Sequence, residues 1–122
     1  MKIYFLDTSF IIDLIKKQKI ALEIHKRIKG FEVTSSVCIY ELAKYSNIDV
    51  YPLFKDKNII LLDIDDAIRA GEINRELSKE GIFIGEIDTL IAGIVKNRNL
   101  ILVTRDQHFK KVPDIKTIFY EI

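Results

Sequence analysis

Four acidic residues of this sequence, each beside an apolar segment, are the groups best suited to chemistry. Asp7 directly follows an apolar run, and Asp106 comes just after another that ends at Val103. Asp88 begins a segment that is otherwise largely apolar, and Glu41 has apolar neighbours on both sides. An acid in such surroundings needs a partner if its side chain faces the interior. No lysine or arginine is an obvious match for any of the four.

Carboxylates that converge without basic partners repel one another, and their pKa values rise. A divalent cation removes that cost, and carboxylate and water oxygens are the ligands that Mg²⁺ and Mn²⁺ prefer. The four acids therefore predict a site for one or two such ions. A structural interpretation of each acid stays open: Asp7 as a helix cap, Asp88 as a helix-start acid, Asp106 as a turn residue and Glu41 as a surface group.

Short apolar strands alternate with helices along the chain, which predicts an α/β fold. Strands are expected at 3–6, 31–34, 59–62, 100–103 and 118–120, and helices at 10–15, 20–28, 63–79 and 86–97, with one more after Ser35 or Ser36 that runs to 45. Buried strands connected in this way form a mostly parallel central sheet with helices on both faces. In such sheets, ligand-binding and catalytic residues lie beyond the carboxyl ends of the strands. Asp7 and Asp106 would lie there.

The length of 122 residues fits one domain, 1–122, and leaves little room for a second. No apolar run reaches the roughly 20 residues needed to span a bilayer, and Asp7 interrupts the stretch that a signal peptide would need. We therefore expect a cytoplasmic protein with no membrane partner.

The net charge of +1 does not indicate a nucleic-acid partner, although a local basic patch is enough to bind phosphates. The single cysteine, Cys38, excludes an internal disulfide and is interpreted as a buried, inert thiol.

Four short motifs occur in an order that resembles a known family. They are Asp7-Thr8-Ser9 after an apolar strand, Tyr40-Glu41-Leu42, Asp88-Thr89-Leu90-Ile91-Ala92, and Val103-Thr104-Arg105-Asp106 followed by Phe109. Each motif is weak by itself. The ordered set, on a chain of this size and pattern, resembles the PIN domain, and most closely the short VapC-like toxins of prokaryotic toxin–antitoxin pairs. The resemblance covers essentially the whole chain.

The resemblance implies a PIN-like fold and a ribonuclease that uses Mg²⁺ or Mn²⁺ to cleave single-stranded or looped RNA. The residues that would bind metal and carry catalysis are Asp7, Glu41, Asp88 and Asp106. Thr104 would orient ligands or water, and Ser9 would place a hydroxyl near the first aspartate. VapC-like proteins commonly form homodimers and are silenced by an antitoxin that blocks the site. A homodimer and a cognate antitoxin are therefore expected for this chain.

Two further residues have roles that the resemblance does not decide. His108 stands where some relatives of the family have a further acid. The expected metal site therefore has one negative charge fewer at its rim. We interpret it as a structural or surface histidine. Glu86 is either an extra acid at the site or an exposed helix-start residue, and we favour an exposed or supporting role.

RNA binding is the least specific part of the prediction. Basic residues expected near the site are candidates for phosphate contacts: Arg105, Lys16, Lys17, Lys110 and Lys111. Tyr40, Tyr45 and Phe109 are candidates for stacking on an unpaired base, but core packing is the favoured interpretation of all three.

Three other interpretations stay open. A PIN nuclease of RNA maturation or decay would keep the enzyme and lack the antitoxin. A non-catalytic RNA- or protein-binding PIN module would keep only the fold, although the presence of all four acids argues against it. A phospho-acceptor domain built on Asp7 usually has a second aspartate two residues later, where this chain has Ser9.

Overall fold

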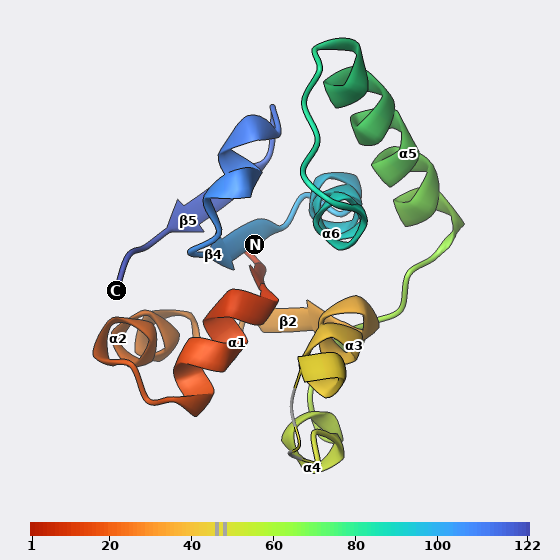
Figure 1. The fold of residues 1–122 in the computed structure, drawn as a ribbon. Helices are drawn as coiled ribbons and strands as arrows, with labels where there is room; N and C mark the ends of the chain where they lie inside the picture. Colours follow the sequence, from red (N-terminus) through yellow and green to blue (C-terminus); the bar gives the residue numbers. More distant parts are fainter. Residues whose placement is uncertain (46, 48) are drawn as a thin grey trace.

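The computed structural model describes residues 1–122 except 46 and 48, and a parallel sheet forms its centre (Figure 1). In the described chain the sheet has five strands in the order β3-β2-β1-β4-β5, and every pairing is parallel. The strands are β1 (Tyr4–Leu6), β2 (Glu32–Ser35), β3 (Ile59–Ile60), β4 (Ile101–Thr104) and β5 (Lys116–Phe119). The predicted α/β fold with a parallel sheet is confirmed.

Helices cover the sheet on both faces, as predicted. In Figure 1, α1 (Thr8–Ile15) and α2 (Lys19–Ile28) lie on one side of the strands, and α5 (Ile64–Lys79) and α6 (Glu86–Asn97) lie on the other. The remaining helical segments are α3 (Ser36–Tyr45), α4 (Tyr51–Phe54) and the 3₁₀ helix η1 (Gln107–Lys111). None of the described helices is long and apolar enough to cross a membrane.

The strand order changes direction between β1 and β4. From β1 the chain adds β2 and β3 on one side, and it then crosses to add β4 and β5 on the other. Such a switch point opens a crevice beyond the carboxyl ends of the two central strands. Leu6 of β1 pairs with Val103 of β4, so the next residues, Asp7 and Thr104, are brought side by side.

A shared core holds the central strands and the helices around this crevice. Phe5 of β1 and Leu102 of β4 have no exposed surface. Phe10 of α1 and Ile91 of α6 belong to the same buried cluster and are equally inaccessible. Burying such a side chain contributes about 1.5–3 kcal/mol relative to leaving it exposed. The core therefore docks α1, which begins directly after Asp7, and α6 onto the sheet.

Two contacts fix α6, which carries Asp88, against α5. At the crossing of these helices, a Cβ built on Gly93 would lie 2.6 Å from the Cβ of Ala70, so the approach needs a glycine. At the carboxyl end of α6, Arg98 Nη2 donates to the buried carboxylate of Asp66 over 2.8 Å. Packing and an ion pair together set the position of the helix that presents Asp88.

Two segments differ from the prediction. The strand expected over 59–62 is reduced to the two half-buried residues of β3, and Leu61 is 70% exposed. An apolar run alone predicted a buried strand, but β3 is at the edge of the sheet and has one strand neighbour. The second difference is α4, which was not among the expected helices; Pro52 lies in its first turn, where a missing backbone N–H is tolerated.

Candidate active site

Asp7 lies buried at the switch point, where two hydroxyl groups bind one of its carboxylate oxygens. Thr104 Oγ1 donates to Asp7 Oδ2 over 2.6 Å, and Ser9 Oγ donates to the same oxygen over 2.8 Å. Asp7 occupies the N-cap position of α1, but its side chain makes no capping hydrogen bond. The interpretation of Asp7 as a helix cap is therefore wrong, because its carboxylate faces the end of β4.

Thr104 connects Asp7 with the segment that carries the last acid. The Thr104 side chain is buried, and its hydroxyl accepts a hydrogen bond from the backbone N–H of Asp106 over 3.0 Å. Ser9 Oγ lies 3.2 Å from the same hydroxyl and accepts from the backbone N–H of Arg105 over 3.3 Å. The two hydroxyls thus hold the turn after β4 against the end of β1, which is the placement that their predicted supporting roles require.

Asp88 and Asp106 lie together with His108 at the rim of the crevice. His108 Nδ1 lies 2.9 Å from Asp106 Oδ1 and 4.0 Å from Asp88 Oδ2. One ligand atom from each of the three residues lies within 4.8 Å of the other two. Asp106 also caps η1, because its Oδ1 accepts from the backbone N–H of His108 over 2.9 Å. Asp106 is therefore a turn residue and a member of the acidic cluster at the same time.

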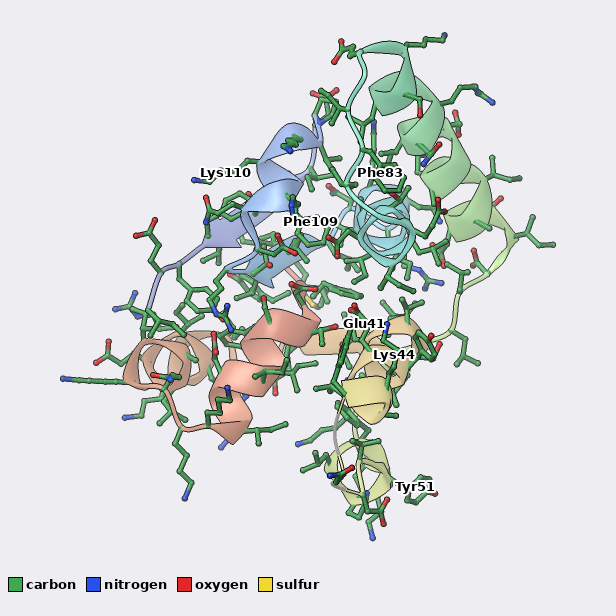
Figure 2. The ribbon with its side chains drawn as sticks, in the orientation of Figure 1. Glu41, Lys44, Tyr51, Phe83, Phe109 and Lys110 are labelled. Carbon is green, nitrogen blue, oxygen red and sulfur yellow. The ribbon has the colours of Figure 1, made fainter. Side chains whose placement is uncertain are left out.

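Glu41 reaches the crevice from α3. Its side chain lies between α3 and the beginning of α1 (Figure 2), where Glu41 Oε1 accepts a hydrogen bond from Thr8 Oγ1 over 2.6 Å. Thr8 directly follows Asp7, so this bond places Glu41 beside the first acid of the cluster. Glu41 is half-buried and is not the free surface group of the alternative interpretation.

The acids influence one another electrostatically. Burial raises the pKa of Asp88 to about 7, helped by the charges of Asp106, Asp7 and Glu41. The pKa of Asp7 is raised as well, because its burial outweighs the hydroxyl groups that stabilise the anion. Among the residues that the structure describes, none of the four acids forms an ion pair with a lysine or arginine. The carboxylate oxygens of the four acids are donors that fit a hard divalent ion.

Known proteins are similar to this chain in sequence and in fold. The family described as PIN domain matches residues 4–115. The chain belongs to the PIN-domain family. Ribonuclease VapC2 of Haemophilus influenzae is 33% identical over 127 aligned residues, which cover 93% of this chain and 95% of that protein. The tRNA(fMet)-specific endonuclease VapC of Shigella flexneri is 32% identical and is covered to 95% of its length. The DNA-bound VapBC structure from Salmonella typhimurium superimposes with a TM-score of 0.85 at 26% identity, covering 98% of both chains.

Within this PIN domain, the predicted phosphate-binding lysines lie in two different places. Lys16 and Lys17 follow the carboxyl end of α1, about 12 Å along that helix from the cluster, and the structure does not bring them to it. Lys110 and Lys111 lie on η1, next to the last acid of the site. Lys110 points outward (Figure 2), with Nζ 5.2 Å from the centre of the Phe119 ring. Glu86 is exposed at the start of α6, in agreement with the favoured interpretation.

Arg105 has a partner that the sequence analysis missed. Its Nε donates to Asp13 Oδ2 over 2.8 Å, and its Nη2 donates to Asp13 Oδ1 over 3.1 Å. Tyr120 Oη donates to Asp13 Oδ2 over 2.6 Å. The guanidinium that was assigned to phosphate binding is thus engaged with a buried carboxylate. An acid inside an apolar helix was the signal that singled out Glu41, and the same signal would have found Asp13.

The three aromatic residues considered for base stacking differ in their exposure, and the cysteine is buried. Phe109 is buried, which confirms its place in the core. Tyr40 is 54% exposed and Tyr45 is 75% exposed, so the core interpretation is wrong for both. Lys44 Nζ lies 4.6 Å from the ring centre of Tyr45 in a cation–π contact at the surface of α3. Cys38 is buried, and burial raises its pKa to about 12, as expected for an inert thiol.

Proposed function

We propose that this chain is a metal-dependent endoribonuclease that cleaves single-stranded or looped RNA, and that it is the toxin of a VapBC-type toxin–antitoxin pair. The observation that carries the proposal is the cluster of carboxylates at the switch point, where burial and the neighbouring acids raise the pKa of Asp88 to about 7 and where no lysine or arginine of the described chain forms an ion pair with an acid of the cluster. The similarity to Ribonuclease VapC2 over 93% of this chain supports the same class of reaction.

The donor set of the cluster fits Mg²⁺ or Mn²⁺, as one ion or two. Asp7, Glu41, Asp88 and Asp106 would hold the metal through carboxylate oxygens, directly or through water. When bound, such an ion lowers the pKa of a water molecule and stabilises the negative charge that develops on the phosphate oxygens.

The surrounding residues hold these ligands and handle protons. Thr104 and Ser9 fix the buried carboxylate of Asp7, and Thr8 fixes one oxygen of Glu41. Asp88 titrates near neutral pH, so it gives up its proton readily when a cation takes the place of that proton. Ligands held in this way need little rearrangement during the reaction, which favours the transition state.

The proposed partners are RNA, a cognate antitoxin and a second copy of the chain, in the cytoplasm. The antitoxin is supported by the similarity to a VapBC complex. A homodimer is supported by Leu61, Ile64 and Ile68, which expose apolar surface around the start of α5. A neighbouring gene for a small DNA-binding protein would favour the toxin over a nuclease of RNA maturation or decay.

Cleavage of a labelled, partly single-stranded RNA in the presence of Mn²⁺, Mg²⁺ or EDTA tests the proposal. We expect metal-dependent products with 5′-phosphate and 3′-hydroxyl ends, because water and not the 2′-hydroxyl would attack phosphorus and the 3′-oxygen would leave with a proton. An Asp7→Asn, Asp88→Asn double variant, checked for folding by circular dichroism, should cut no faster than the EDTA reaction.

The matched control is an Asp56→Asn, Asp65→Asn double variant, which removes the same charge from two exposed residues outside the cluster. This control should cut like the wild type. Equal cutting by the site variant would reveal a contaminating nuclease. No cutting, together with no rise in melting temperature on adding Mn²⁺, would contradict the proposal and favour a non-catalytic binding module.

A further inference from the structure

The rim of the acidic cluster carries a histidine that the carboxylate chemistry does not use. His108 lies in η1 with 58% of its side chain exposed. Its Nδ1 approaches Asp106 Oδ1 to 2.9 Å and Asp88 Oδ2 to 4.0 Å. The other histidine of the chain, His25, lies beside Glu32 at the start of β2, which is the opposite edge of the sheet. His108 is therefore the histidine in reach of the cluster.

The turn after β4 positions the His108 ring without depending on it. Asp106 Oδ1 already accepts the backbone N–H of His108 over 2.9 Å, so the backbone closes the turn. The contact of the exposed ring with the same oxygen adds little to the stability of the turn, because water competes for it. The ring is thus held near two carboxylates and is free to exchange its contact for a stronger one.

The spacing of these groups matches that of ligands around a single ion. An octahedral ion with ligands at about 2.1 Å places adjacent ligand atoms about 3.0 Å apart and opposite ones about 4.2 Å apart. The separations of His108 Nδ1 from Asp106 Oδ1 and Asp88 Oδ2 are 2.9 Å and 4.0 Å, close to these two values, and one ligand atom from each of the three residues lies within 4.8 Å of the other two.

We infer that His108 supplies a nitrogen ligand to the metal ion of this site and thereby favours Mn²⁺ over Mg²⁺. The inference rests on the proposed function, because it concerns the ion that the nuclease would use. Mg²⁺ takes oxygen ligands and keeps several waters, whereas imidazole is a ligand of the softer transition metals. A site with one imidazole among its carboxylates therefore discriminates between ions that a purely carboxylate site treats more alike.

Pulsed electron paramagnetic resonance of Mn²⁺-loaded protein tests this assignment directly, because the ¹⁴N nucleus of a bound imidazole modulates the electron spin echo. Wild type, His108→Gln and His25→Gln would be compared after circular dichroism has shown that each is folded. We expect ¹⁴N modulation in the wild type and in His25→Gln, which is the matched control, and its loss in His108→Gln.

Calorimetric titration with each ion provides a second readout. His108→Gln should weaken Mn²⁺ binding on the order of tenfold and Mg²⁺ binding much less. His108→Asp replaces the nitrogen ligand by an oxygen ligand, so it should lower the preference for Mn²⁺ over Mg²⁺. An unchanged ratio of the two affinities in both variants would overturn the inferred selectivity.

The possible outcomes separate this inference from the proposed function. Bound Mn²⁺ without ¹⁴N modulation in the wild type, or modulation that survives in His108→Gln, would overturn the inference and leave the metal-dependent nuclease standing. A wild-type protein that binds neither ion would overturn both.

Discussion

The charge on Asp88 destabilises the folded chain whenever no cation is bound. Burial and the neighbouring acids raise the pKa of Asp88 from 3.8 to about 7. A carboxyl group with a raised pKa stabilises the fold below about pH 4, and that contribution is lost as the pH rises through about 7. Asp88→Asn should therefore stabilise the metal-free protein at pH 8 by on the order of 2 kcal/mol, while it abolishes metal-dependent cleavage.

Thermal unfolding in EDTA at pH 8 and pH 4 measures this effect. The advantage of Asp88→Asn should be several degrees at pH 8 and should shrink toward zero at pH 4, where the carboxyl is protonated. Asp65→Asn removes an exposed acid from the first turn of α5 and should show no such gain. If Asp88→Asn melted below the wild type at pH 8, Asp88 would not lie among repelling carboxylates.

At the scale of elements, the crossing of α5 and α6 depends on one glycine. A Cβ added to Gly93 would lie 2.6 Å from the Cβ of Ala70 and 2.7 Å from its backbone nitrogen. Gly93→Ala must push the helices apart, which should lower the free energy of unfolding by about 1–3 kcal/mol. Because α6 carries Asp88, the shift should also weaken Mn²⁺ binding.

Gly71→Ala is the matched control for this crossing. Gly71 lies on α5, and nothing lies within 4 Å of a Cβ built there. Alanine is favoured over glycine in a helix by about 1 kcal/mol, so this variant should be at least as stable as the wild type. Urea unfolding compares the two substitutions, and equal losses from both would show that close packing at Gly93 is not what holds the helices together.

At the scale of the whole molecule, the acidic edge could be predicted because its signals are local. Asp7 follows an apolar strand, and Asp106 comes two residues after β4 ends. Parallel strands bring such positions to one edge of a sheet, whatever the order of the strands. The helix over 86–97 was also predicted with its observed bounds, because acids at its start and an apolar face along it are both readable in sequence.

Features that depend on distant partners could not be predicted. The bond between Arg105 and Asp13 joins residues 92 positions apart, and no periodicity indicates it. The exposure of Tyr40 depends on which side of α3 meets the rest of the molecule. Likewise, the length of β3 is set by its partner β2 and not by the apolar residues that follow it.

Asp13 links the beginning of the chain to its end. Its side chain lies in α1 and is 1% exposed, yet it is bound by Arg105 beyond β4 and by Tyr120 beyond β5. Asp13→Asn removes the charge that both partners bind. Because the Arg105 side chain is 39% exposed, it can turn to water, so the free energy of unfolding should fall by a moderate amount, about 1–3 kcal/mol.

The pH dependence of this linkage has the opposite sign to that of Asp88. Burial alone would raise the pKa of Asp13, but the hydrogen bonds from Arg105 and Tyr120 outweigh it and hold the pKa below its usual value. The resulting stability is present above about pH 4 and is lost as the pH falls further. Urea unfolding between pH 6 and pH 3 should therefore show a steeper loss for the wild type and for the exposed-site control Asp56→Asn than for Asp13→Asn. Parallel curves for all three would mean that the Asp13 carboxylate does not hold the two ends of the chain together through its charge.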